Sequence, residues 1–224
     1  ALERATSIYL VDRVVPMLPE KLSNGVCSLR PQEEKLCFSA VFHMDENAKI
    51  HKEWFGRTII KSDKRFTYEE AQEVIDNKKG IMTKELLTLN DLAKKLRKER
   101  FNQGSIAFER VEVKFILDEQ GAPTGVHFKE HGETNELIEE FMLLANRKVA
   151  AFIGDVGDKK KPKTFVYRIH DKPDPDKLEN FAEFVEKFGY NINTKSDKAV
   201  TSSINRLLKE VEGKKEENVI ETLA

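Results

Sequence analysis

Apolar and polar residues alternate with two different periods along this chain. Residues 35–44 and 49–60 repeat every second position, which is typical of half-buried strands, and Asp45-Glu46-Asn47 between them favours a hairpin. Residues 83–100 repeat with the helical period instead. They place Leu86, Leu87, Leu92 and Leu96 on one apolar stripe.

The rest of the chain continues this mixture of strands and helices. Thr67 followed by Glu70 forms a capping-box pattern that starts a helix ending near Asn77. Further predicted elements are the end of a helix at 1–7, a buried extended segment at 9–19, a turn at 23–25, strands at 105–108, 111–117, 125–128 and 164–169, and helices at 135–153, from Asp174 or Asp176 through Phe188, 196–211 and 216–223. The order predicts an α+β fold, largely antiparallel strands with inserted helices, and no repeating βαβ unit.

Composition places the chain among ordinary folded proteins with a charged surface. Apolar residues make up 39% and charged residues 34%, and the formal net charge is −1. Strong overall attraction to nucleic acid is therefore not expected, and RNA binding would depend on local patches. Cys27 and Cys37 suggest buried free thiols in a reducing compartment, and we find no membrane-spanning run or signal peptide. These features predict a cytoplasmic location.

Two patterns resemble metal sites, and neither fits well. His127 to His131 matches H-x-x-E-H, but that zinc chemistry requires a helix, and glycines on both sides indicate a strand entering a turn. Asp171, Asp174 and Asp176 could hold Mg²⁺, yet their alternation with prolines before a helix favours capping. Neither pattern is therefore predicted to hold a metal ion; the resemblance described below also implies no metal ligands and no catalytic residues in this segment.

Two basic runs are candidate RNA contacts. One lies on the predicted helix at residues 94–100, and the other is the loop DKKKPK at residues 158–163. Both could follow an RNA backbone. A solvated, cation-favouring helix end and a solvated loop explain them at least as well.

Several long stretches resemble the RNB catalytic domain of the ribonuclease II and ribonuclease R family, and in particular the bacterial ribonuclease R branch. The most specific are SIYLVDRVVPMLPEKLSNGVCSL and FVYRIHDKP; the resemblance continues through TIIKSDKRFTYEEAQ, FNQGSIAFERVEVKFIL and NELIEEFMLLAN. It implies a 3′-to-5′ exoribonuclease that hydrolyses single-stranded RNA to nucleoside monophosphates. It also implies Mg²⁺ as cofactor, single-stranded RNA as partner, and neither a membrane nor a small-molecule cofactor.

The same resemblance assigns three RNA-binding residues. Tyr9 and Phe108 match the aromatic residues that clamp stacked bases at the 3′ end, which suits an enzyme without sequence preference because every base has a π-face. Glu139 matches a glutamate that contacts the substrate, where a carboxylate can accept a hydrogen bond from a ribose 2′-OH. Without the resemblance, a partly buried tyrosine, a core phenylalanine and a helix-surface charge would explain these residues.

The resemblance further implies that residues 1–224 are an internal segment of one catalytic domain. The family's metal-binding aspartates, a later arginine, the cold-shock domains and the S1 domain would all lie outside it. The segment is then expected to supply part of the RNA cradle and to be inactive alone. Two alternatives stay open: a non-catalytic RNA-binding or scaffold homologue, and an interaction domain with no role in RNA.

Overall fold

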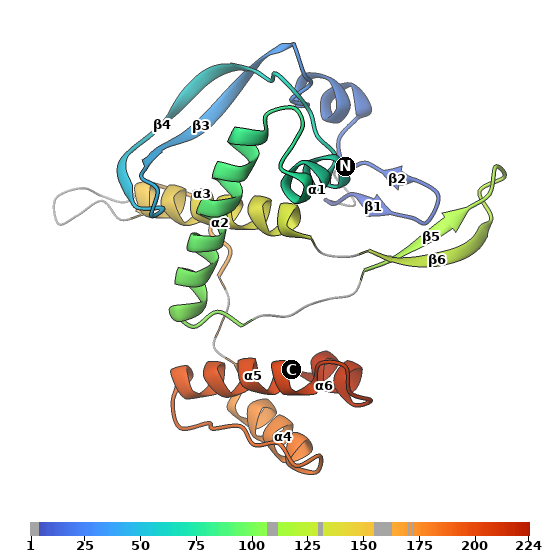
Figure 1. The fold of residues 1–224 in the computed structure, drawn as a ribbon, viewed down its shortest axis with the longest axis vertical. Helices are drawn as coiled ribbons and strands as arrows, with labels where there is room; N and C mark the ends of the chain where they lie inside the picture. The colour runs from blue at the N-terminus through green and yellow to red at the C-terminus, as the bar shows by residue number, and fades with distance from the viewer. Residues whose placement is uncertain (1–4, 107–111, 130–131, 155–162, 170, 172) are drawn as a thin grey trace. The chain divides into compact units, whose positions relative to one another are not determined.

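A computed structural model describes the whole chain except residues 1–4, 107–111, 130–131, 155–162, 170 and 172 (Figure 1). The chain divides into two compact units, Ala1–Ala93 with Val111–Val149, and Lys94–Arg110 with Ala150–Ala224. We refer to them as unit 1 and unit 2. The described elements are β1 (Ile8–Tyr9), β2 (Val14–Val15), a π-helical turn (Lys21–Val26), β3 (Glu34–Met44), β4 (Ile50–Lys61), α1 (Tyr68–Asn77), α2 (Thr83–Asn102), β5 (Glu112–Leu117), β6 (Pro123–Lys129), α3 (Glu133–Gly154), α4 (Pro175–Glu186), α5 (Asp197–Val211) and α6 (Glu217–Leu223).

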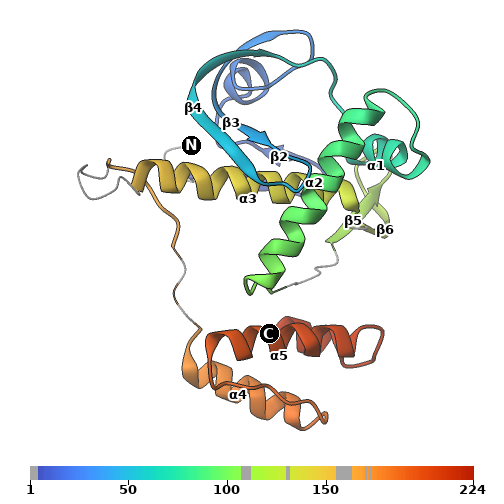
Figure 2. The ribbon, with the colours of Figure 1, turned by 60° about the vertical axis from the view of Figure 1, so that its left-hand side comes forward.

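Among the described residues the strands pair only as two-stranded antiparallel ribbons, β1 with β2, β3 with β4, and β5 with β6. This confirms the predicted α+β class with antiparallel strands and inserted helices. The long β3–β4 ribbon, visible in Figure 2, pairs Leu36 with Ile59 and Ser39 with Gly56. Near its hairpin end, Lys148 Nζ of α3 lies 2.8 Å from the Glu53 carboxylate of β4.

The two faces of the β3–β4 ribbon differ. Leu36, Phe38 and Ile59 share one face and are 87%, 70% and 66% exposed; we call this the outer apolar face. On the opposite face, the Trp54 ring covers Gly56 so closely that a Cβ atom at Gly56 would overlap it. Gly56 is therefore required for this close approach.

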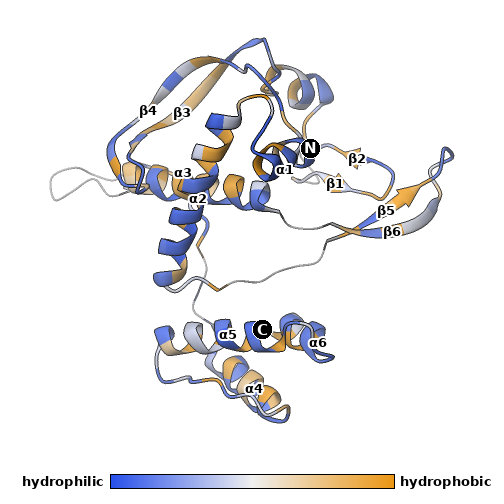
Figure 3. Ribbon diagram, viewed as in Figure 1, coloured by the Kyte–Doolittle hydropathy of each residue, from blue (hydrophilic) through white to orange (hydrophobic). Residues whose placement is uncertain are grey.

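The β5–β6 ribbon also presents an apolar face. Cross-strand pairing brings Val113 opposite Phe128 and Phe115 opposite Val126. All four side chains are exposed, and Figure 3 shows the corresponding orange of β5.

Helix α1 begins where the sequence predicts because its capping box forms. The Glu70 amide donates to Thr67 Oγ1 at 3.1 Å, and the Thr67 amide donates to the Glu70 carboxylate at 2.8 Å. The helix ends at Lys78, whose φ of 52° is left-handed. Helices α4 and α5 are likewise capped, by Asp174 and Ser196.

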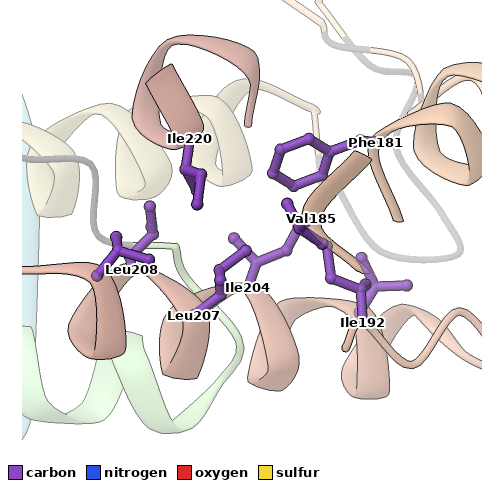
Figure 4. Close-up of a cluster of buried hydrophobic side chains, with 9 residues drawn as sticks. Phe181, Val185, Ile192, Ile204, Leu207, Leu208 and Ile220 are labelled. Atoms are coloured by element: carbon purple, nitrogen blue, oxygen red, sulfur yellow. The ribbon is translucent and has the colours of Figure 1, made fainter. Parts of the chain in front are cut away.

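Unit 2 has a helical core. Figure 4 shows side chains from α4, α5 and α6 pointing toward one another, and Val185, Leu207 and Ile220 are each no more than 2% exposed. The buried cluster consists of Phe181, Val185, Ile192, Val200, Ile204, Leu207, Leu208, Val211 and Ile220.

Four predicted segments differ from the structure, in addition to the strand expected at residues 105–108, which is described below. Residues 5–7 are not helical, and residues 164–169 form no strand because no described segment pairs with them. Residues 9–19 are largely extended but exposed, since a two-residue ladder is too short to bury them. The predicted turn at 23–25 lies inside the π-helical turn, which begins as the amides of Leu22 and Ser23 donate to the Pro19 carbonyl.

Candidate RNA-binding site

Tyr9 lies on an exposed strand of unit 1. It pairs with Val14 across the β1–β2 ladder, and the intervening turn is closed by the Leu10 amide donating to the Arg13 carbonyl at 2.8 Å. The Tyr9 side chain is 79% exposed. It is therefore not a core residue of this chain, and its ring face is accessible to a base.

Phe108 lies outside the residues that the structure describes. The two described residues before it, Ser105 and Ile106, are not in a strand as predicted. The Ser105 carbonyl accepts a hydrogen bond from the Asn205 side chain at 2.8 Å, and Ile106 packs against the helical core of unit 2. The Ser105 carbonyl is therefore bonded to the side chain of Asn205 in α5, and not to the backbone of a neighbouring strand.

Glu139 lies in the part of α3 that belongs to unit 1 and is half-buried. The buried stripe of this helix includes Leu137, Leu144 and, unexpectedly, Glu140, which is 1% exposed. The spacing of Leu137, Glu140 and Leu144 at i, i+3 and i+7 is the helical signal that could have revealed the buried carboxylate.

A cavity of about 660 Å³ lies beside this helix in unit 1. Its walls carry the aromatic residues Phe66 and Tyr68 and the apolar Leu89 of α2, with the cationic Arg65 and Lys114 also in the lining. An apolar pocket with a few polar or charged groups is the usual form of a small-ligand site. The full lining is Arg65, Phe66, Thr67, Tyr68, Glu69, Ala71, Leu86, Leu89, Lys114, Thr134, Leu137 and Ile138.

The start of α1 is hydrogen-bonded to the start of α3 at this cavity. Thr134 Oγ1 lies 3.3 Å from both the Tyr68 carbonyl and Gln72 Oε1, and the Thr134 amide donates to Gln72 Oε1 at 3.1 Å. Thr134 is 4% exposed. The cavity and these contacts were not predicted, because they depend on residues more than sixty positions apart.

The metal-like patterns behave as capping and strand residues. His127 is an exposed residue of β6, while Glu130 and His131 lie outside the described part of the chain. Asp174 caps α4 by accepting from the amides of Asp176 and Lys177 at 2.9 and 3.5 Å. Within the described residues no cluster of three or more metal-ligating side chains occurs.

The basic run on α2 is partly engaged with an aromatic ring. The guanidinium groups of Arg97 and Arg100 lie 4.9 and 5.0 Å from the centre of the Phe101 ring. Such cation–π contacts favour a structural role for these two arginines. Residues 159–161 of the other basic run lie outside the described residues.

The cysteine prediction is correct in one respect and wrong in another. Both Cys27 and Cys37 are free, as expected, but Cys27 is exposed and Cys37 is half-buried. Cys37 lies in β3 of a two-stranded ribbon, on the face whose residues Lys35 and Ser39 are likewise only half-buried. No helix in the described residues is both long and apolar enough to cross a membrane.

The chain thus combines antiparallel ribbons, a helical unit and a cavity lined by aromatic and cationic residues. The chain belongs to the RNB domain family, whose profile matches residues 1–224. It is 38% identical over 224 residues to DIS3-like exonuclease 2 of Schizosaccharomyces pombe, with 92% of this chain and 24% of that protein covered. It is 34% identical over 232 residues to ribonuclease R 1 of Lactococcus lactis, with 100% and 27% covered.

Solved structures agree with this assignment. Apo RNase R of Mycoplasma genitalium is similar with a TM-score of 0.83 and 26% identity, covering 98% of this chain and 34% of that one. Yeast Ssd1, described as a pseudonuclease, shares the fold with a TM-score of 0.68 and 18% identity, covering 99% and 26%. The chain therefore spans about a quarter to a third of the length of these relatives.

Proposed function

We propose that the complete protein is a 3′-to-5′ exoribonuclease that hydrolyses single-stranded RNA to nucleoside monophosphates. The observation that carries this proposal is the RNB match along all of residues 1–224, together with relatives named as ribonuclease R and DIS3-like exonuclease. The similar M. genitalium RNase R has been solved with ribose-methylated single-stranded RNA and with double-stranded RNA. RNA is therefore the proposed partner.

Within that enzyme, this chain is proposed to be an internal segment that forms part of the RNA cradle. The exposed Tyr9 ring would stack on a base, Phe108 would stack on the same run of bases, and Glu139 would accept from a 2′-OH. The cavity beside α3 would receive a nucleotide, with its aromatic and apolar walls against the sugar and base. Arg65 and Lys114 would neutralise phosphate charge.

A metal cofactor is proposed for the complete enzyme, with Mg²⁺ as the specific ion. The described residues do not fit such a site, because none of them form a cluster that could hold a metal ion. We therefore assign to this chain the binding and orientation of RNA, and no step that involves the metal. The cytoplasm is the proposed location, which the two free cysteines support.

The test is digestion of a single-stranded RNA, labelled at its 5′ end, by the complete protein with and without Mg²⁺. We expect progressive shortening from the 3′ end and release of nucleoside monophosphates, dependent on the ion. Arg65→Ala and Lys114→Ala should weaken RNA binding and each lower the slope of log affinity against log salt by about 1. Lys84→Ala, at an exposed position of α2 outside the cavity lining, is the matched control.

A second candidate is a non-catalytic RNA-binding protein of the same fold. The likeness to yeast Ssd1, a pseudonuclease, supports it, because this fold also occurs without nuclease activity. A complete protein that binds single-stranded RNA but never shortens it, at any Mg²⁺ concentration, would select this candidate and contradict the first.

A further inference from the structure

Gln72 and Thr134 connect α1 to the first turn of α3 within unit 1. Gln72 Oε1 accepts from the Thr134 amide at 3.1 Å and lies 3.3 Å from its hydroxyl, while Gln72 Nε2 donates to Asp76 at 2.9 Å. The glutamine side chain is thus fixed at both ends. We call this group of contacts the α1–α3 clasp.

The clasp caps α3 from a different helix. The amides of the first turn of a helix have no partner within the helix, so an acceptor must come from elsewhere. Gly132 O accepts from the amides of Asn135 and Glu136 at 3.0 and 3.3 Å, and Gln72 supplies the acceptor for Thr134. A Cβ atom at Gly132 would lie only 2.7 Å from Gln72 Oε1, so a side chain there would displace the Gln72 amide from its present position.

The clasp lies in the wall of the cavity. Tyr68, whose carbonyl faces the Thr134 hydroxyl, lines the cavity on the α1 side, and Thr134 and Ile138 line it on the α3 side. Glu139 follows Ile138 directly. The partly buried hydrogen bonds that Thr134 makes therefore help to set the position of α3 along α1, and with it the distance from Glu139 to Tyr68.

We propose that Gln72 and Thr134 are positioning residues, which hold the two walls of the cavity at the spacing that accepts a ribonucleotide. This inference rests on the proposed function of the cavity. Displacement by about 1 Å is enough to weaken a site whose contacts depend on geometry. Because the 2′-OH makes one short directional contact, RNA binding is expected to be more sensitive to this displacement than DNA binding.

The experiment compares Thr134→Val, Thr134→Ser and Gln72→Met in the complete protein. Valine keeps the shape and the amide of Thr134 and removes only its hydroxyl. We expect Thr134→Val and Gln72→Met to lower the affinity for a short RNA about three- to tenfold, as for a lost hydrogen bond, and to change the affinity for DNA of the same sequence less. Thr134→Ser should restore the RNA preference.

Thr88→Val is the matched control. The Thr88 hydroxyl donates to the Lys84 carbonyl of its own helix at 2.8 Å and does not line the cavity. It should leave the ratio of RNA to DNA affinity unchanged. A purely structural role for the clasp would instead lower the melting temperature and weaken RNA and DNA binding equally, and that result would overturn the inference.

The outcomes separate this inference from the proposed function. If the wild-type protein shortens RNA and Arg65→Ala weakens binding, but Thr134→Val keeps the wild-type RNA-to-DNA ratio, only the positioning role is wrong. If the wild-type protein binds RNA without shortening it, the nuclease activity is wrong and the affinity ratio still decides the positioning role. Absence of RNA binding by the wild-type protein would overturn both.

Discussion

Tyr9 offers most of its ring to solvent from a strand that contributes little to the core. If the ring stacks on a base, Tyr9→Ala in the complete protein should cost about 1–3 kcal/mol of RNA binding. Short RNAs make few other contacts, so we expect digestion to stop earlier and leave a longer final product. Tyr9→Phe should restore the short product, because stacking needs only the ring face. Gel analysis of the end products of a labelled RNA measures both.

Ile8→Ala is the control for Tyr9, since Ile8 is the neighbouring residue in β1 and pairs with Val15. It should keep the wild-type product length. Phe108→Ala should act in the same direction as Tyr9→Ala, and the double substitution should be less than additive if both rings grip one stack. A Tyr9→Ala protein with wild-type products and a lowered melting temperature would instead show that Tyr9 is structural.

Glu139 is proposed to read the 2′-OH. Removing a charged acceptor costs about 1.5–3 kcal/mol, so Glu139→Ala should lower the ratio of RNA to DNA affinity about tenfold or more. The measurement is titration of RNA and DNA strands of one sequence into the complete protein. Glu136→Ala, one turn earlier on α3, should leave the ratio near its wild-type value. An unchanged ratio in Glu139→Ala would remove this residue from the site.

The sequence predicts the identity of candidate residues better than their surroundings. Tyr9, Phe108 and Glu139 were chosen by resemblance, and their roles stay predictions. The helical spacing places Glu140 in line with Leu137 and Leu144, but a charged residue is ordinarily assigned to the surface, so its burial was not predicted. Its burial depends on packing that only the structure reveals.

At the scale of the element, the capping box of α1 makes a direct prediction. Thr67→Ala removes the acceptor for the Glu70 amide and should lower the free energy of unfolding by about 1 kcal/mol. Thr67→Ser keeps that acceptor and should recover most of the loss. Urea unfolding measures the difference, and equal stability of the alanine and serine proteins would contradict a role for the cap.

The same capping box predicts that the stability of the fold depends on pH. The hydrogen bond from the Thr67 amide, and then the nearby Lys64, hold the pKa of Glu70 below the ordinary glutamate value of 4.5. A lowered folded-state pKa stabilises the fold above the unfolded pKa, and this contribution is lost as the pH falls through the folded pKa. The stability difference between wild type and Glu70→Gln should therefore be constant above about pH 5.5 and shrink in acid. A difference that grows in acid would contradict this assignment.

Elements with a local signal were predicted almost to the residue. The β3–β4 hairpin and helices α1, α4 and α5 carry their own alternation, caps and turns. The segment at 164–169 has the composition of a strand but no partner in the described chain, and a strand exists only through pairing. The strand predicted at residues 105–108 is absent at its described residues, 105 and 106, for the same reason.

At the scale of the molecule, the helical cluster of unit 2 should set the stability of that unit. Leu207 is 2% exposed within it, so Leu207→Ala should lower the stability of unit 2 by about 2–5 kcal/mol. Loss of helical circular dichroism on heating measures this change. Lys209→Ala, on the exposed side of the same helix, is the control and should stay within about 0.5 kcal/mol of wild type.

The apolar faces of the ribbons predict self-association of the isolated chain. Leu36, Phe38 and Ile59 form an exposed patch of a kind that soluble monomers rarely keep. Light scattering should show dimers or larger species at high concentration, and Phe38→Lys should reduce them. Lys52→Ala, in β4 but outside this face, is the control. A clean monomer that binds no apolar dye would contradict this prediction.

The family and the fold class could be predicted from sequence, because long specific stretches carry the resemblance and the periodicities carry the class. The α1–α3 clasp and the cavity could not. They depend on Thr134 reaching Gln72 across 62 positions, and no local pattern encodes such a contact.

The close cover of Gly56 by Trp54 also gives this chain an optical reporter. Trp54 is its single tryptophan and belongs to unit 1. Selective excitation of the indole therefore records the local environment of the β3–β4 ribbon, whereas the helical cluster of unit 2 contributes ellipticity without indole emission. Fluorescence and circular dichroism, followed during one thermal scan, would show directly whether the two units melt together or in separate steps.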